Sequence, residues 1–217
     1  MQRYLKKTHT NLMRILSGCL LYAMMTMAGF TEDIKLEPYS ENMVKAAESG
    51  DSKAQYNLGA LLFGGSGVIK NDEKAFYWMK KAAEQGIPNA QNFVGLSYQN
   101  GRGVEKNLQQ AFIWTKKAAE QGVDNAKYNL AFMYKNGEGV AASSTNSYLW
   151  FTKAAESGYA PAEVSLGQCY RNGTGVVRDD DKAFQWIEKA AAHGDVYAKA
   201  LLIEMKVEKN SKGKPEK

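Results

Sequence analysis

The chain has 217 residues, of which 44% are hydrophobic, and it carries a formal net charge of +5. That length and composition suffice for a buried core of ordinary size. Four of the positive charges, on Arg3, Lys6, Lys7 and Arg14, lie in the first 28 residues, which contain no acid. The remainder has a formal charge of only +1, which gives no electrostatic reason to expect nucleic acid as a partner.

The first 28 residues have the order of a secretory signal peptide. Residues 1–14 are polar and basic, residues 15–28 form an uncharged run of 14, and Thr26-Met27-Ala28 supplies small residues at a possible cleavage site. The run is shorter than the roughly 20 residues of a membrane-spanning helix, so an uncleaved anchor is the competing interpretation. We expect an exported protein, periplasmic or secreted, with no membrane span once the signal is removed. Residues 29–40 are interpreted as a linker.

The segment Leu16-Ser17-Gly18-Cys19 is similar to a bacterial lipoprotein acylation box. However, the apolar stretch should precede such a cysteine, and here most of it follows. We therefore interpret Cys19 as part of the hydrophobic segment. After removal of the signal only Cys169 remains, and a single thiol cannot form an internal disulfide.

A 36-residue repeat follows the linker. Glycines recur at this step after Lys-Ala-Ala segments, at Gly50, Gly86, Gly122, Gly158 and Gly194. Such a period is typical of arrays in which one repeat cannot bury its apolar face alone and packs against its neighbours. A stack of this kind favours a binding protein over an enzyme.

The second repeat illustrates the expected unit. Helical spacing of apolar residues predicts a first helix over residues 89–98, ended by Gly101 in a left-handed conformation. A second helix is expected over residues 108–121, with Asn107 as its N-cap and Gly122 as its terminator. The predicted inward stripe of this second helix is Ala111, Trp114 or Thr115, and Ala118.

Two further positions recur at the same step. The first helices carry a small residue that should let two helices cross closely, at Gly59, Gly95, Ala131 and Gly167. The second helices carry all the tryptophans, at Trp78, Trp114, Trp150 and Trp186. Aromatic residues at one fixed position in every repeat indicate packing and not a cofactor site.

These residues together resemble the Sel1-like repeat, a relative of the tetratricopeptide repeat. The pattern A-x-x-x-L-G-x-x-Y-x-x-G-x-G-V followed by A-x-x-W-x-x-K-A-A-x-x-G covers about residues 43–203. The resemblance implies an all-α fold, a right-handed α-solenoid superhelix of antiparallel helix pairs, used as an adaptor or scaffold in protein assemblies. The solenoid is expected over residues 41–208, with half-repeat caps and full repeats at 52–87, 88–123, 124–159 and 160–195. Residues 209–217 contain no apolar side chain and are expected to be disordered.

Few side chains are suited to catalysis. Cys169 aligns with Leu61, Ser97 and Met133 inside a first helix, so we expect a buried and inert thiol. His193 is interpreted as a solvated polar position at a helix end. The acidic run Asp179-Asp180-Asp181 begins a helix, where negative charge complements the macrodipole. We predict no catalytic residue, no metal and no cofactor; an enzyme that uses Cys169 is the alternative from another class.

The resemblance also indicates where a partner would bind. First helices line the concave face of tetratricopeptide-like stacks, and the side chains expected there differ from repeat to repeat, unlike the framework. Aromatic residues and arginine dominate many interfaces. The predicted partner-binding residues are Tyr56, Phe63, Asn92, Leu96, Gln99, Tyr128, Phe132, Lys135, Gln168, Arg171 and Tyr197.

The predicted function is a non-enzymatic protein–protein interaction module. It would act as an exported adaptor, scaffold or regulator that binds another protein in its concave groove. The partner could be an envelope protein, a sensor domain, a toxic effector or a host protein. The alternative within the binding class is an immunity protein that neutralises a toxic effector enzyme in the periplasm. The sequence leaves the oligomeric state open.

Overall fold

The computed structural model describes residues 38–212, with side chains up to Val207, and within that range it contains ten helices and no strand. The predicted signal peptide at 1–28 lies outside the described residues, as do most of the predicted linker and residues 213–217. Short connections join consecutive helices, and each helix packs against the next within its unit, so the pairs run antiparallel. The predicted all-α, helix-pair architecture of a solenoid is confirmed.

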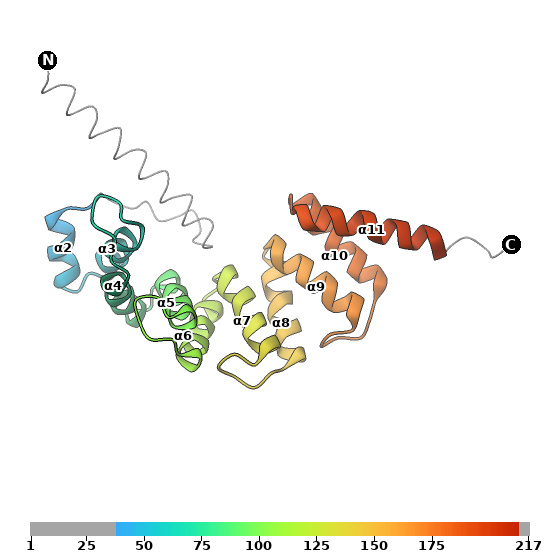
Figure 1. Cartoon of the computed structure of the whole chain (residues 1–217), viewed down its shortest axis with the longest axis horizontal. Helices are drawn as coiled ribbons and strands as arrows, with labels where there is room; N and C mark the ends of the chain where they lie inside the picture. The colour runs from blue at the N-terminus through green and yellow to red at the C-terminus, as the bar shows by residue number, and fades with distance from the viewer. Residues whose placement is uncertain (1–37, 213–217) are drawn as a thin grey trace, which may run out of the picture. The chain divides into compact units, whose positions relative to one another are not determined.

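The chain divides into two compact units, of which the first ends at Val123. Its helices, coloured blue to green in Figure 1, are α2 (Glu41–Glu48), α3 (Ser52–Gly64), α4 (Asp72–Glu84), α5 (Pro88–Asn100) and α6 (Leu108–Glu120). One core cluster runs through these helices and includes Leu58, Met79 and Val94. The small α2 supplies the half-repeat that was predicted before the first full repeat.

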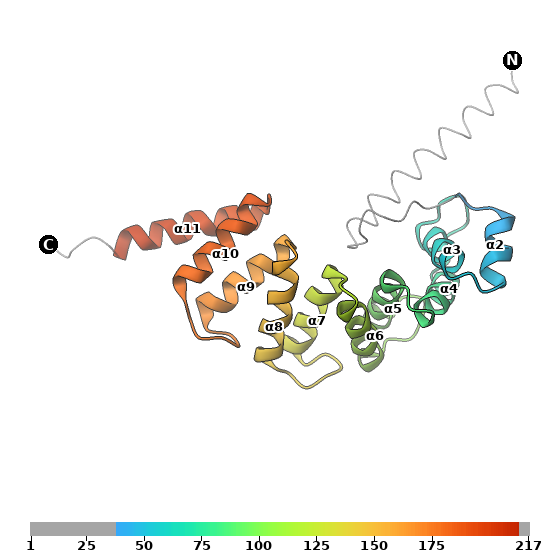
Figure 2. The same cartoon turned by 180° about the vertical axis from the view of Figure 1, so that it is seen from behind.

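Unit 2 begins at Asp124. Its helices, yellow to red in Figure 2, are α7 (Asp124–Asn136), α8 (Ser144–Glu156), α9 (Ala160–Asn172), α10 (Asp180–Ala192) and α11 (Val196–Lys212). Two core clusters lie in this unit, one that includes Phe151 and Leu166 and one that includes Ile187 and Leu201. Helix α11 runs to Lys212, so the first four residues of the segment expected to be disordered are helical.

Local chemistry sets the helix ends as the sequence predicts. Asn107 caps α6, because its side-chain oxygen accepts a hydrogen bond from the Gln110 backbone N–H at 3.0 Å. Gly101 ends α5 with φ of 70°, and Gly122 follows α6 with φ of 95°. Both are left-handed backbone conformations that favour glycine.

Small residues bring the two helices of a repeat close together, as predicted. A Cβ atom added to Gly167 would lie 2.7 Å from Ile187 Cδ1, and one added to Gly59 would lie 2.8 Å from Met79 Cγ. At Gly95 the added atom would clash with the Thr115 hydroxyl. The helix pair of each of these repeats therefore depends on the missing side chain.

The predicted inward stripe of α6 is also confirmed, and it includes both Trp114 and Thr115, which are buried together with Ala111 and Ala118. Lysines three residues further on cover the repeat tryptophans. The Lys117 ammonium lies 4.3 Å from the Trp114 ring centroid, and Lys153 lies 4.2 Å from that of Trp150. The tryptophans are packing residues with a cationic cover.

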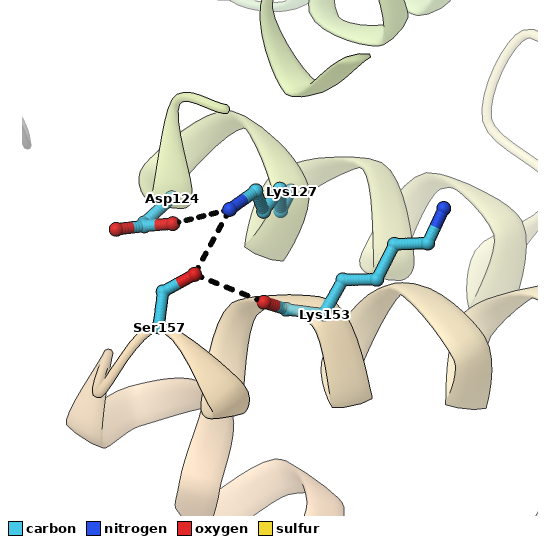
Figure 3. Close-up of polar contacts among 4 residues, drawn as sticks. All are labelled: Asp124, Lys127, Lys153 and Ser157. Atoms are coloured by element: carbon cyan, nitrogen blue, oxygen red, sulfur yellow. Dashed lines mark hydrogen bonds and ion pairs between the residues drawn. The ribbon is translucent and has the colours of Figure 1, made fainter. Parts of the chain in front are cut away.

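A polar contact ties the start of the first helix of each repeat to the end of its second helix. We call this contact the repeat clasp; its two residues are always 30 apart, and the pairs are Gln55–Gln85, Gln91–Gln121, Lys127–Ser157 and Glu163–His193. In the third repeat the Lys127 ammonium donates to Asp124 Oδ1 at 2.7 Å and to Ser157 Oγ at 2.9 Å (Figure 3). Ser157 in turn donates to the Lys153 carbonyl oxygen at 3.1 Å. The clasp joins the two helices of a repeat at the end opposite the turn that connects them; in the second repeat this turn contains Gly101 and Gly103. We call this connection the glycine turn.

Candidate functional site

The predicted partner-binding residues differ widely in exposure, and two of them in unit 1 are enclosed. Tyr56 is 3% exposed and Asn92 is 0% exposed. Burial also raises the pKa of the Tyr56 hydroxyl. Both side chains lie inside the helix stack, because the first helices are surrounded on most sides: seven of the thirteen residues of α3 are buried. Neither side chain is available to a partner in this structure.

Phe63 is half-buried, and the side chains of Phe93 and Arg102 pack against its ring. Its ring meets the Phe93 ring edge-on at 5.0 Å, and the Arg102 guanidinium lies over it at 3.9 Å from the centroid. Arg102 is also ion-paired with Asp72 at 3.2 Å. The other two predicted residues of unit 1, Leu96 and Gln99, are half-buried. The contribution of Arg102 was missed because it lies in the glycine turn and not on a first helix.

In unit 2 the predicted aromatic residues form a cluster at the surface of α7. Tyr128 and Phe132 have ring centroids 4.9 Å apart, and both rings contact the buried Phe151 ring. Tyr159 meets Tyr128 at 5.4 Å. Burial raises the pKa of Tyr128, although a hydrogen bond with Ser165 on α9 opposes that change. The two rings are thus fixed on their inner side and half-exposed on the outer side.

Polar pairs continue this surface from α9 to α11. The Gln168 amide donates to the Tyr197 hydroxyl at 3.2 Å, and Arg171 forms an ion pair with Glu204 at 3.2 Å. Lys135 is exposed on α7, with its ammonium 5.5 Å from the Phe132 centroid. The sequence predicted a basic end made by Lys135 and Arg171, but Glu204 was missed, and it balances the charge of Arg171.

The contacts between Tyr128 and Ser165 and between Gln168 and Tyr197 link α7, α9 and α11 into one surface. We call it the unit 2 face. It consists of Tyr128, Phe132, Lys135, Gln168, Arg171, Tyr197 and Glu204. The face offers aromatic edges, a side-chain amide and both signs of charge, which are groups suited to binding a polypeptide surface.

The residues considered for catalysis have structural roles. Cys169 is 6% exposed, and burial raises the pKa of its thiol while the charge of Lys135 opposes that rise. Asp179 is the N-cap of α10, and its hydrogen bond from the Lys182 backbone lowers its pKa. Asp180 is ion-paired with Arg178 at 2.9 Å. A raised thiol pKa disfavours the thiolate that a nucleophile needs.

His193 is exposed at its helix end, as interpreted, but the interpretation missed its contact with Glu163. Its Nδ1 atom lies 2.8 Å from Oε2 of Glu163, a carboxylate that is 0% exposed. The Lys189 ammonium lies 3.1 Å from the other carboxylate oxygen. A buried carboxylate requires such partners, and the 30-residue pairing of clasp positions is the signal that would have revealed this one.

Across residues 38–212 no group of three or more His, Cys, Asp or Glu side chains is arranged to hold a metal ion. No helix in that same range is both long enough and apolar enough to cross a membrane.

Comparison with protein families matches the Sel1 repeat four times, at residues 52–87, 88–123, 124–159 and 160–195. The chain belongs to the Sel1 repeat family. The four matches have the boundaries that the sequence predicted. Sel1 repeats form protein-interaction scaffolds, and this Sel1 repeat chain has that architecture in both units. A comparison with curated proteins finds no significant match.

Solved structures of Sel1 repeat proteins are similar to the chain. A Sel1 repeat protein from Oxalobacter formigenes shares 34% identity over 74% of this chain and 64% of its own, with a TM-score of 0.68. A protective antigen of uropathogenic Escherichia coli with an SLR fold shares 41% identity over 76% of this chain and 35% of its own, with a TM-score of 0.70. The chain therefore spans less than two thirds of either protein. Cysteine-rich protein B of Helicobacter pylori shares 27% identity over 63% of this chain and 98% of its own, with a TM-score of 0.50.

Proposed function

We propose that this Sel1 repeat protein binds a segment of a partner protein on its unit 2 face. The observation that carries the proposal is that the residues that pack the repeats together are constant, whereas the exposed residues of the first helices vary. Glycine, alanine and tryptophan positions repeat at a constant step, whereas the exposed first-helix positions change from one repeat to the next. Residues that hold a repeat together need to be the same in each copy, and residues that bind one partner do not.

The chemistry of the face indicates what the partner segment offers. Its aromatic edges suit an apolar side chain laid against Tyr128 and Phe132. Lys135, exposed beside the Phe132 ring, suits an acidic group next to that side chain. Because Phe151 and Tyr159 already fix the two rings, little side-chain freedom is lost on binding.

We also propose that the protein is exported and meets its partner in the cell envelope. The support is the order of basic, apolar and small residues over positions 1–28. Fractionation of the producing cell, followed by N-terminal sequencing of the recovered protein, tests this. A chain that starts at Met1 and stays in the cytosol would contradict export. The immunity role stays a prediction.

Affinity capture tests the unit 2 face. The variant should combine Lys135→Glu with Tyr197→Ala, because both residues are exposed and are not part of the aromatic cluster. Loss of such contacts typically costs about 2 kcal/mol, so we expect recovery of the partner to fall by roughly 30-fold. The matched control is Leu149→Ala on α8, which removes an apolar side chain that is 48% exposed.

The control should recover as much partner as the unmodified chain, and both variants should keep the same far-ultraviolet circular dichroism. A partner that the double variant captures equally well would contradict the proposal. So would failure of the unmodified chain to enrich any envelope protein over the double variant.

A further inference from the structure

The last described helix, α11, exposes an apolar stripe. Val196 is 80% exposed, Ile203 is 66% exposed and Val207 is 63% exposed, and Ala200 between them is also exposed. The opposite side of the same helix is buried, through Ala198, Leu201 and Met205. A helix with apolar residues on both sides has one side without a partner in the described part of the chain.

Ile203 marks this side as different from the corresponding side of the other first helices. It stands at the repeat position of Gly59, Gly95, Ala131 and Gly167, where the small residue admits the second helix of the same repeat. At Gly167 even one added carbon would meet Ile187 at 2.7 Å. The side chain of Ile203 fills the space that such a second helix would need, so this side suits a different occupant.

The spacing of the stripe is that of a coiled-coil seam. Val196, Ala200, Ile203 and Val207 follow one another at steps of four, three and four residues, which is the a/d pattern of a heptad. Continuous apolar residues at this spacing pack best against an identical stripe on a second helix.

Charges beside the stripe favour a second copy of the chain in parallel orientation. Lys199 and Glu204 occupy the g and e positions, five residues apart, and both are exposed. In a parallel pair the g residue of one helix faces the e residue of the next heptad in its partner. Lys199 of each copy would thus face Glu204 of the other, whereas an antiparallel pair would place Lys199 against Lys206.

The flanks of α11 leave this seam accessible. Glu204 faces α9, where it is paired with Arg171, and the Lys206 ammonium lies 6.0 Å from the Phe184 ring of α10. The a/d stripe therefore points away from both helices. A carboxylate has two acceptor oxygens, so Glu204 can bind Arg171 of its own chain and Lys199 of the second copy together.

We propose that two copies of the chain associate through α11, in parallel, along the stripe from Val196 to Val207. The stripe covers 12 residues, about 18 Å of helix, which makes a small interface. We therefore expect a dissociation constant on the order of 10–100 µM. Of the unit 2 face, the dimer uses only Glu204, and it does not require the partner proposed for that face.

Sedimentation velocity of the full chain over about 1 to 500 µM tests the dimer. We expect a monomer at low concentration and a dimer at high concentration. Ile203→Asp should remain monomeric throughout, because it buries two carboxylates in the seam. The matched control is Ile69→Asp, at an apolar residue of unit 1 that is 89% exposed, and this variant should dimerise normally. A chain that is monomeric at every concentration, or association that Ile203→Asp leaves unchanged, would overturn the proposal.

Charge exchange tests the parallel orientation with variants at exposed residues. Lys199→Glu alone and Glu204→Lys alone should each weaken the dimer by about tenfold, since each places two pairs of like charges together. An equimolar mixture of the two variants should regain the dimer, because both contacts then join opposite charges. Stronger association of Lys199→Glu by itself would indicate an antiparallel pair and contradict the proposed arrangement.

Discussion

The two units close their repeats at the same place with different chemistry. In unit 1 the Gln85 amide donates to the Gln55 side chain at 2.8 Å, and Gln121 donates to Gln91 at 2.6 Å. In unit 2 each clasp contains a charged residue, Lys127 or Glu163, and Glu163 is fully buried between His193 and Lys189. An amide pair remains neutral if one contact is lost, whereas a buried carboxylate without its hydrogen-bonding and ionic partners is strongly unfavourable. The clasps of the two units thus occupy the same place in the repeat, but loss of a contact should cost more stability at Glu163 than at the glutamine pairs.

Thiol labelling compares how often each unit opens. Cys169 in unit 2 and Ser97 in unit 1 occupy aligned positions and are 6% and 3% exposed. In chains that carry Cys19→Ser, we expect Cys169, or a thiol from Ser97→Cys with Cys169→Ser, to react at least about a thousandfold more slowly than in urea. The ratio of the two rates measures the difference in opening between the units. Fast labelling of native Cys169 would contradict its inert role and favour the enzyme alternative.

Alanine at the second glycine of a turn should destabilise both units alike. Gly103 and Gly175 have φ of 69° and 72°, and an added Cβ would clash with the carbonyl oxygens of Asp72 and Ser144. Strain and overlap together should cost about 3 kcal/mol in either unit, measured by urea unfolding.

Gly122→Ala and Gly158→Ala are the controls for those turns. Their φ values are also positive, at 95° and 84°, but an added Cβ would meet nothing within 4 Å. They should lose only about 1 kcal/mol. Equal losses at all four glycines would show that the close approach to Asp72 and Ser144 does not matter.

Removal of the two side chains beside Glu163 should lower the stability more than the matching removal beside Gln91. Lys189→Ala with His193→Ala leaves the Glu163 carboxylate buried without either neighbour and should cost about 2–3 kcal/mol in urea unfolding. The matching change in unit 1, Lys117→Ala with Gln121→Ala, should cost about 1 kcal/mol, because Gln91 is neutral and keeps its bond to the Ala83 carbonyl.

Conversion of the Glu163–His193 clasp into a glutamine pair, as in unit 1, tests whether the buried carboxylate causes this difference in stability. Glu163→Gln with His193→Gln should recover most of the stability, and a further Lys189→Ala should then have only a small effect. If the converted chain still requires Lys189 for stability, the contribution of that lysine comes from its position over the Trp186 ring and not from Glu163.

The smallest expected difference concerns an aromatic pair. Phe76 and Tyr98 meet edge-on in unit 1, whereas Tyr148 and Tyr170 do so in unit 2 with their hydroxyls 2.9 Å apart. That hydrogen bond, and then burial, raise the pKa of Tyr170 to about 12. A raised pKa in the folded state stabilises the fold below the ordinary tyrosine value of about 10, and this contribution is lost as pH rises toward 12.

Tyr148→Phe should make the unit 2 pair similar to that of unit 1. It should lower the pKa of Tyr170 and cost about 1 kcal/mol at neutral pH. Absorbance titration of tyrosinate, with Tyr170→Phe as the reference that identifies the signal, measures the change. An unaltered Tyr170 titration would show that burial alone sets its pKa.

The framework could be predicted from the sequence because it depends on local and periodic chemistry. Asn107, Gly101 and Gly167 act through their own backbone or through one neighbour at a fixed step. The exposure of a first-helix residue depends instead on every helix around it. Positions aligned with Tyr56 are buried in three of the four repeats, at Tyr56, Asn92 and Val164, so the repeat pattern alone did not fix which side of a first helix faces outward.

The contacts that were missed share one property. Arg102 with Phe63, Glu204 with Arg171 and His193 with Glu163 each join residues that are about one repeat apart but on different helices or turns. A sequence read repeat by repeat shows what is the same in each copy. These pairs appear only when the variable positions are compared with one another.

The repeat clasp also bears on how a chain of similar repeats avoids misfolding. Near-identical helices can dock on the wrong neighbour during folding, because their apolar faces are interchangeable. The clasps of unit 2 discriminate among these neighbours: a helix that carries Glu163 docked beside Gln85 would have Lys81 in place of Lys189 but would lose the contact with His193. Wrong pairings of this kind are less stable than the correct one. The charged residues thus help each helix of unit 2 to pair with its correct neighbour. Gln55 and Gln91 are identical and provide no such distinction between their own two repeats.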